Sequence, residues 1–103
     1  MAYRVSIAAR AARDLVSLYD RINAEESAAA LWYQGLKRAI LSLEEHPNRG
    51  STTPERKQLR HLLYGRKPHV DRVIYKILET KKQVEVLHVR YGPRRRFRID
   101  DLR

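Results

Sequence analysis

The sequence contains no cysteine, and it has only one tryptophan and one phenylalanine among 103 residues. A chain without cysteine forms no disulfides, and it offers neither a thiol nucleophile nor a zinc-thiolate site. Long hydrophobic runs are also lacking, since no stretch approaches the roughly 18 apolar residues of a membrane span. We therefore expect a soluble, cytoplasmic protein with no membrane partner, folded as a single domain over residues 1–103 around one modest core.

Recognised metal and phosphate motifs are missing as well. The histidines fall on different predicted elements and have no companions at ligand spacing; they are His46, His61, His69 and His88. The sequence has neither a Gly-rich phosphate loop nor the elbow motif of a serine nucleophile. These patterns predict a protein without a metal or a cofactor.

Negative charge is scarce, and positive charge is abundant. Twenty-two Lys and Arg against 12 Asp and Glu give a formal net charge of +10, with a pI near 10.4. Residues 1–48 mix both signs, whereas bases dominate residues 49–76 and 90–103. The expected partner is a polyanion such as nucleic acid or the ribosome, or an acidic protein segment. The alternative is a merely soluble basic surface, although such a surface normally interleaves both signs.

The N-terminal half predicts a short strand followed by two helices. Tyr3 to Ile7 alternates like a strand, and the apolar residues from Ala8 to Ile22 then recur at helical spacing. A second helix is predicted from Ser27, a good N-cap, to His46, before Pro47. Its expected apolar stripe is Leu31, Trp32, Leu36, Ala39, Ile40 and Leu43. The short link between the helices favours an antiparallel pair.

The C-terminal half predicts strands. Residues 48–57 have the composition of a loop, Leu59 to Tyr64 reads as a strand, and residues 70–97 form a β-hairpin. The tail either adds a further short strand around Phe97 to Ile99 or frays. The fold class is therefore α+β: an antiparallel β-sheet with an N-terminal helical hairpin packed on one face, in the order β-α-α-β-β-β.

The hairpin gathers cationic and aromatic side chains on neighbouring strands. Alternation in the second strand assigns residues to two faces: Leu87, Val89 and Tyr91 on one, and Val86, His88 and Arg90 on the other. The loop decides which residue faces Arg72. A two-residue loop at Lys81 and Lys82 places Tyr91 opposite Arg72, whereas an odd loop places Arg90 there.

Such a cluster suits a phosphodiester that is handled without a metal. Arginines bind the phosphate and stabilise its charge, while a tyrosine or histidine moves a proton. The candidate catalytic residues are Arg72, Arg90 and Tyr91, and His88 is a second candidate for proton transfer. The candidate nucleic-acid-binding residues are Arg60, Lys76, His88, Arg94, Arg95 and Arg96. The competing interpretation is that Arg72 and Arg90 are ordinary strand cations on a solvated face.

Several short motifs, taken in order, resemble the RelE/ParE superfamily of type II toxin-antitoxin toxins. The resemblance covers nearly the whole chain through YRV (Tyr3 to Val5), ARDL (Ala12 to Leu15), LEEHP (Leu43 to Pro47), RHLLYG (Arg60 to Gly65), DRVIYKI (Asp71 to Ile77) and VEVLHVRYGPRR (Val84 to Arg95). It implies a compact antiparallel sheet with two N-terminal helices, in agreement with the periodicity.

The resemblance implies one of two activities. RelE-like members cut messenger RNA in the ribosomal A site with basic residues and a Tyr or His, whereas ParE-like members poison DNA gyrase. Arg72 matches the central-strand arginine that contacts the phosphate, and Arg90 with Tyr91 matches the end of the last main strand. By the same resemblance, Arg60 and Arg95 are phosphate binders. Many relatives carry His-Gly where this chain has Tyr91 followed by glycine, so tyrosine takes the proton-transfer role under the nuclease interpretation.

Three functional classes remain open at this stage. We expect an mRNA endoribonuclease that inhibits translation; the alternatives are a gyrase inhibitor without nuclease activity and a plain nucleic-acid-binding module. Both toxin interpretations imply a cognate antitoxin whose acidic, amphipathic segment covers the cations and orders on binding.

Overall fold

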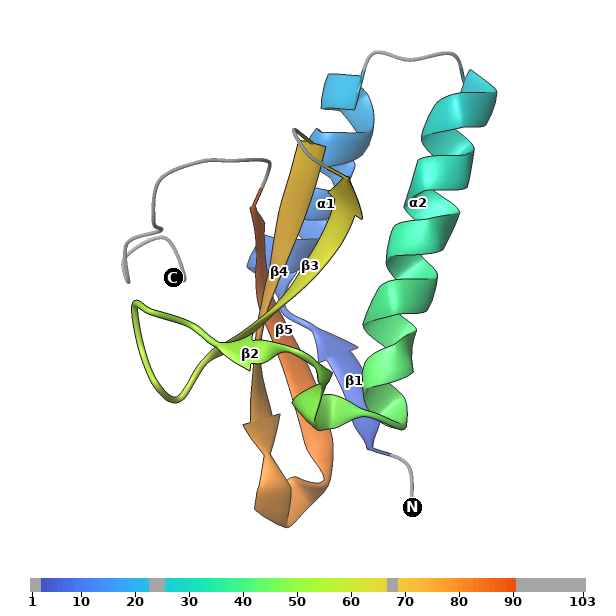
Figure 1. Ribbon diagram of the computed structural model, residues 1–103. Helices are drawn as coiled ribbons and strands as arrows, with labels where there is room; N and C mark the ends of the chain where they lie inside the picture. Colours follow the sequence, from blue (N-terminus) through green and yellow to red (C-terminus); the bar gives the residue numbers. More distant parts are fainter. Residues whose placement is uncertain (1–2, 23–25, 67–68, 91–103) are drawn as a thin grey trace.

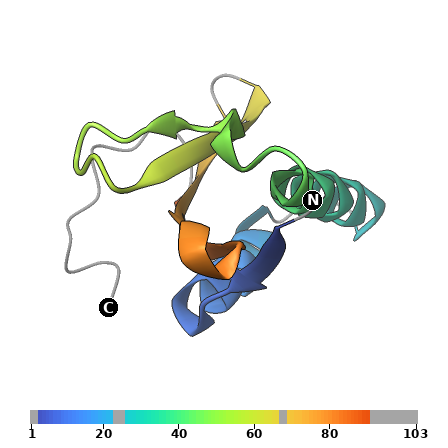
Figure 2. The same ribbon diagram turned by 90° about the horizontal axis from the view of Figure 1, so that it is seen from below.

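The computed structural model describes residues 3–22, 26–66 and 69–90 (Figure 1). Its elements are β1 (Arg4–Ile7), α1 (Ala9–Ile22), α2 (Glu26–Leu41), the 3-10 turns η1 (Ser42–Glu44) and η2 (Pro47–Arg49), β2 (Ser51–Thr52), β3 (Arg60–Arg66), β4 (His69–Leu78), the 3-10 turn η3 (Glu79–Lys81) and β5 (Gln83–Arg90). The strands form one sheet in the order β1-β5-β4-β3-β2. Seen end-on in Figure 2, both helices lie on the same side of that sheet.

This architecture confirms the predicted α+β class, with two differences in the sheet. The pairs β2–β3, β3–β4 and β4–β5 are antiparallel, but β1 pairs parallel to β5, so the sheet is mixed. β2, which pairs with β3, falls inside the stretch predicted as a loop. The predicted strand around Phe97 to Ile99 lies outside the described residues. None of the helices in the described ranges is long and apolar enough to cross a membrane.

The main core lies between the helices and the sheet. α1 contributes Ala11, Leu15 and Leu18, whose spacing of four and three residues places them on one face of the helix. Leu36, Ile40 and Leu43 follow the same rule in α2 and η1. The sheet contributes Leu62, Val73, Tyr75, Val84, Val86 and Val89. A smaller cluster of Leu59, Ile74 and Leu87 covers the opposite face, since Ile74 alternates with Val73 and Tyr75.

The second helix departs from its prediction in the first residue of its apolar stripe and in the position where it ends. Leu31 is 73% exposed, so its placement on the buried stripe was wrong. The regular helix ends at Leu41 rather than His46, because the chain tightens into η1, where the Ser42 hydroxyl donates to the Ala39 carbonyl oxygen (2.6 Å).

Close contact between α2 and β3 depends on a glycine. A Cβ at Gly35 would lie 2.1 Å from the hydroxyl oxygen of Tyr64 on β3. That hydroxyl donates to the Trp32 carbonyl oxygen (3.1 Å), and the Trp32 and Tyr64 rings meet edge to face. The helix is therefore held against the sheet by a specific polar contact as well as by the core.

The hairpin of β4 and β5 contains a bulge that changes the side-chain phase. Arg72 pairs with Arg90 and Ile74 with His88, but the next residue, Tyr75, pairs with Val86. Leu87 is therefore the extra residue of a β-bulge. As a result Val86 and Val89 both enter the main core, and the strict alternation predicted for β5 was wrong.

The hairpin connection and the bulge at Leu87 together set the register at Arg72. Leu78 pairs with Gln83, and residues 79–82 form the connection, with Lys82 in the left-handed conformation (φ 51°). Neither the two-residue loop nor the odd loop considered above is therefore correct. Arg90, not Tyr91, is the residue opposite Arg72.

Candidate functional site

Two of the predicted catalytic residues face each other across the hairpin. Arg72 on β4 and Arg90 on β5 are direct cross-strand partners, and such pairs have their Cβ atoms about 4.5–5.5 Å apart on one face. The remaining predicted catalytic residue, Tyr91, lies outside the described residues, as do Arg94, Arg95 and Arg96. The described part of the site is therefore an arginine pair at the end of β5.

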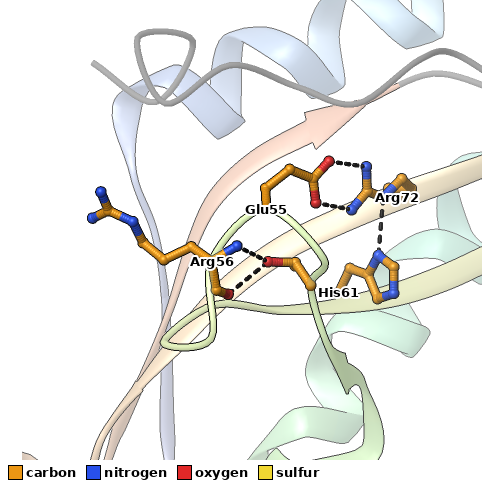
Figure 3. Close-up of polar contacts among 5 residues, drawn as sticks. Glu55, Arg56, His61 and Arg72 are labelled. Carbon is orange, nitrogen blue, oxygen red and sulfur yellow. Dashed lines mark hydrogen bonds and ion pairs between the residues drawn. The ribbon is translucent and has the colours of Figure 1, made fainter.

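Arg72 is gripped by a carboxylate and an imidazole. Its Nη1 and Nη2 donate to Glu55 Oε2 (3.0 Å) and Oε1 (3.1 Å), which is a bidentate ion pair, and its Nε donates to His61 Nδ1 (2.9 Å). Figure 3 shows the Glu55 carboxylate facing the Arg72 guanidinium, with His61 below Arg72 in this view. The side chains of Arg72 and Glu55 are only 12% and 6% exposed, so this contact is held mostly out of water.

The protonation state of His61 follows from this geometry. Its Nδ1 accepts the Arg72 Nε–H, so the neutral ring carries its proton on Nε2. Burial lowers the pKa of His61, and the charge of Arg72 lowers it further, while Glu55 acts in the opposite direction. His61 is therefore neutral at neutral pH.

The loop that presents Glu55 is closed by its own hydrogen bonds. Thr53 Oγ1 donates to the Arg56 carbonyl oxygen (2.7 Å) and accepts from the Arg56 N–H (3.1 Å). The Thr53 and Leu59 amides donate to the carbonyl oxygens of Leu59 (2.9 Å) and Arg56 (3.1 Å), respectively. The stretch predicted as a loop is thus a defined turn, and it holds Glu55 over β3 and β4 (Figure 3).

Sequence reasoning did not identify Glu55 or His61 as site residues. One signal was available, because Glu55 is the single acidic residue between Glu45 and Asp71, in an otherwise basic stretch. An isolated carboxylate among cations favours a specific ion pair over a solvated face.

Arg60 and Tyr75 stabilise the segment that leads into β2. Arg60, predicted to bind phosphate, donates from Nη1 to the Gly50 carbonyl oxygen (2.6 Å). The buried Tyr75 hydroxyl donates to the Pro47 carbonyl oxygen (2.7 Å) and accepts from the Gly50 N–H (2.9 Å). Burial raises the pKa of Tyr75, against the lowering effect of the Gly50 hydrogen bond and of the charges of Arg60 and Arg49. Tyr75 thus remains a neutral phenol and acts as a structural clip.

Lys76 and His88 lie apart from the Arg72–Arg90 pair. Lys76 contacts Glu85 (3.5 Å), its cross-strand partner, and it stands four residues along β4 from Arg72, or roughly 13 Å. His88 is 4% exposed, and its Nδ1 lies 2.5 Å from Asp14 Oδ2 on α1. Because its ring is buried against α1, His88 is not part of an exposed nucleic-acid surface.

Asp14 collects three hydrogen bonds at the junction of α1 and β5. Its Oδ2 accepts from the Val89 N–H (3.0 Å) and contacts His88 Nδ1, and its Oδ1 accepts from Arg10 Nε (3.1 Å). Burial would raise the pKa of Asp14, but the bonds from His88, Val89 and Arg10 outweigh it and lower that pKa. Asp14 is therefore ionised at neutral pH.

The described ranges contain no group of three or more His, Cys, Asp or Glu side chains that could hold a metal ion. What the site offers is a guanidinium pair with one carboxylate and one imidazole. Guanidinium groups are typical anion binders, and carboxylates and imidazoles are typical proton carriers.

Comparison with known proteins identifies the family. Residues 5–99 match the model of the ParE toxin of the type II toxin-antitoxin system parDE. The chain belongs to this toxin family. Among curated proteins, none matches the sequence.

Solved toxin structures share the fold. The chromosomal ParDE toxin-antitoxin system from P. aeruginosa matches with a TM-score of 0.71 and 20% identity, over 87% of this chain and 96% of that chain. The toxin-antitoxin complex RelBE2 from Mycobacterium tuberculosis matches at 0.64 and 21%, over 91% and 95%. The isolated E. coli RelE toxin matches at 0.60 and 16%, over 90% and 87%. This member of the ParE toxin family thus shares its fold with both ParE-like and RelE-like structures.

Proposed function

We propose that this toxin is a metal-independent endoribonuclease that cleaves messenger RNA at the ribosome and so inhibits translation. The observation that supports it is the Glu55–Arg72–His61 cluster beside Arg90. Cleavage of RNA without a metal needs cations on the phosphate, a base for the 2′-hydroxyl and an acid for the leaving oxygen. A carboxylate, an imidazole and two guanidinium groups within one patch match that requirement.

The proposed reaction is attack by the RNA 2′-oxygen on the adjacent phosphorus. The new 2′-O–P bond forms a cyclic phosphate, and the bond from phosphorus to the 5′-oxygen breaks. Arg72 and Arg90 stabilise the charge that builds on the phosphoryl oxygens. We assign to Glu55 the proton of the 2′-hydroxyl and to Tyr91 the proton that the 5′-oxygen receives.

A cognate antitoxin is the second part of this proposal. A net charge of +10 on a small domain favours an acidic partner, and membership of a type II toxin family gives that partner a role. We expect an acidic, amphipathic antitoxin segment that orders on binding and covers the cationic site.

The direct test is cleavage of a defined mRNA on programmed ribosomes, read by primer extension. Arg72→Ala and Glu55→Gln should each lower the cleavage rate by about 10²-fold or more, as expected for loss of a charge-stabilising or proton-transfer group. Lys57→Ala is the matched control, because Lys57 is exposed on the same turn. Circular dichroism checks that each variant is folded. A fully active, folded Arg72→Ala protein rejects the assignment.

Gyrase inhibition is the second candidate, and it is favoured by the ParE family match and by the ParDE structural neighbour. Under this function the Arg72–Glu55 ion pair has only a structural role. Purified toxin should then block supercoiling by gyrase while leaving mRNA intact, and Glu55→Gln should keep that inhibition.

A further inference from the structure

The outer edge of β5 loses its strand neighbour partway along. β1 pairs with β5 as far as Ile7, which lies opposite Val86, and the Ala8 N–H donates to the Val86 carbonyl oxygen (2.8 Å). α1 then begins at Ala9, and among the described strands none pairs with this edge of residues 87–90. Main-chain N–H groups along this edge need acceptors from outside the sheet.

Asp14 supplies one such acceptor from α1, which packs against β5. Its Oδ2 accepts the Val89 N–H, which points away from β4 because successive N–H groups of a strand point to opposite edges. The same oxygen contacts His88 Nδ1, and an ionised carboxylate only accepts, so the imidazole donates from Nδ1. Arg10 holds the other carboxylate oxygen. Asp14 is part of the ARDL motif, to which the proposed reaction gives no role.

The residue that follows these contacts is Arg90. Asp14 thus grips two consecutive residues, His88 and Val89, directly before the arginine that pairs with Arg72. The bulge at Leu87 interrupts the β4–β5 ladder just upstream, so the end of β5 depends more on contacts from outside the hairpin.

We propose that Asp14 is a positioning residue for Arg90: it fixes the end of β5 so that Arg90 stands opposite Arg72 over the phosphate. The inference rests on the proposed nuclease function and deepens it. A displacement of about 1 Å in a charge-stabilising group can cost about 10²-fold in rate, so a carboxylate far from the phosphate controls cleavage through the strand.

The test uses Asp14→Asn, which keeps the side-chain shape but removes the negative charge and leaves one acceptor oxygen for the three donors of His88, Val89 and Arg10. Asp20→Asn on the exposed side of the same helix is the matched control. On programmed ribosomes we expect kcat to fall about 10²-fold in Asp14→Asn with KM little changed, because Arg90 acts in the transition state. Asp20→Asn should cleave like the wild type.

A double-mutant cycle separates positioning from general destabilisation. In an Arg90→Ala background Asp14→Asn should cause no further loss of kcat, because the group that Asp14 positions is gone. Equal losses in both backgrounds, or a kcat in Asp14→Asn within threefold of the wild type, would overturn the proposal. Arg10→Ala provides a milder variant if Asp14→Asn does not fold, with a smaller loss of kcat in the same direction and the same dependence on Arg90.

Amide hydrogen exchange gives a readout that does not depend on activity. The amide hydrogen of Val89 should exchange at least tenfold faster in Asp14→Asn than in the wild type. Unchanged exchange would contradict the claim that Asp14 fixes the end of β5. If the wild type itself does not cleave mRNA, the nuclease proposal fails and the positioning role fails with it. A cleaving wild type with an unimpaired, folded Asp14→Asn variant defeats only the positioning inference.

Discussion

Replacing Tyr75 with phenylalanine removes one hydroxyl that joins the sheet to the segment before β2. Tyr75 is fully buried, and its hydroxyl bonds the Pro47 carbonyl oxygen at 2.7 Å and the Gly50 N–H at 2.9 Å. Phenylalanine keeps the ring in the core but leaves the buried Gly50 N–H without this acceptor. A buried polar group that loses its partner costs about 1–3 kcal/mol.

The expected loss of unfolding free energy is therefore about 2 kcal/mol, or roughly 8–16 °C in Tm for a domain of this size. Urea denaturation followed by circular dichroism measures it, and the m-value should not change, since the exposed surface of the unfolded chain is the same. Tyr33→Phe is the control, because Tyr33 lies on the exposed side of α2, and its effect should stay within about 0.5 kcal/mol.

The pH dependence adds an independent check. Burial raises the pKa of Tyr75 above 10.0, so the folded state keeps its proton at a pH where the unfolded chain loses it. Stability should fall as the pH rises above about 10, and the Tyr75→Phe variant should lack this part of the slope. A loss below about 0.5 kcal/mol in Tyr75→Phe at neutral pH would refute the argument that this hydroxyl clips the segment in place.

Three further predictions concern single groups. Gly50→Ala should destabilise the fold by about 1–3 kcal/mol in urea denaturation, because its Cβ would lie 2.5 Å from the His61 carbonyl oxygen. The pKa of His61 is lowered in the folded state, so its contribution to the free energy of unfolding is complete above pH 6.5 and is lost as the pH falls from 6.5 through the pKa of the folded state. His61→Gln should therefore abolish this fall in the urea midpoint. The pKa of Asp14 is also lowered in the folded state, so its contribution to the free energy of unfolding is present above about pH 4 and is lost as the pH falls through the pKa of the folded state. Asp14→Asn should therefore reduce the loss of stability below pH 4 in urea denaturation. An unchanged loss in this variant would contradict the prediction.

The fold was predictable because its signals are local. The period of the apolar residues marked both helices and the hairpin, although the second helix ends at Leu41, before the stop expected at Pro47. The direction of β1 was not predictable in this way, because alternation is the same in parallel and antiparallel strands. Leu31 was misplaced because periodicity assigns a face but does not say how far the core extends along that face.

The site was predictable only in part. Alternation brought Arg72 and Arg90 to one hairpin, and the structure made them partners. Alternation could not predict the bulge at Leu87, which changes the face on which the following side chains of β5 lie. His88, in the same strand, is buried. Alternation also could not identify Glu55, because the contact between Glu55 and Arg72 joins a loop to β4 across 17 positions of sequence. The site-residue assignments themselves stay predictions until the variants are measured.

The parallel pairing of β1 with β5 has a consequence for how the toxin folds during its synthesis. Arg4 of β1 lies beside Gln83, so β1 finds its neighbour only when β5, the last described strand, has been made. Contacts between such distant parts of a chain form late and slowly. The nascent polypeptide therefore carries an incomplete sheet until β5 has been made, and the arginine pair, which joins β4 to β5, is assembled only then.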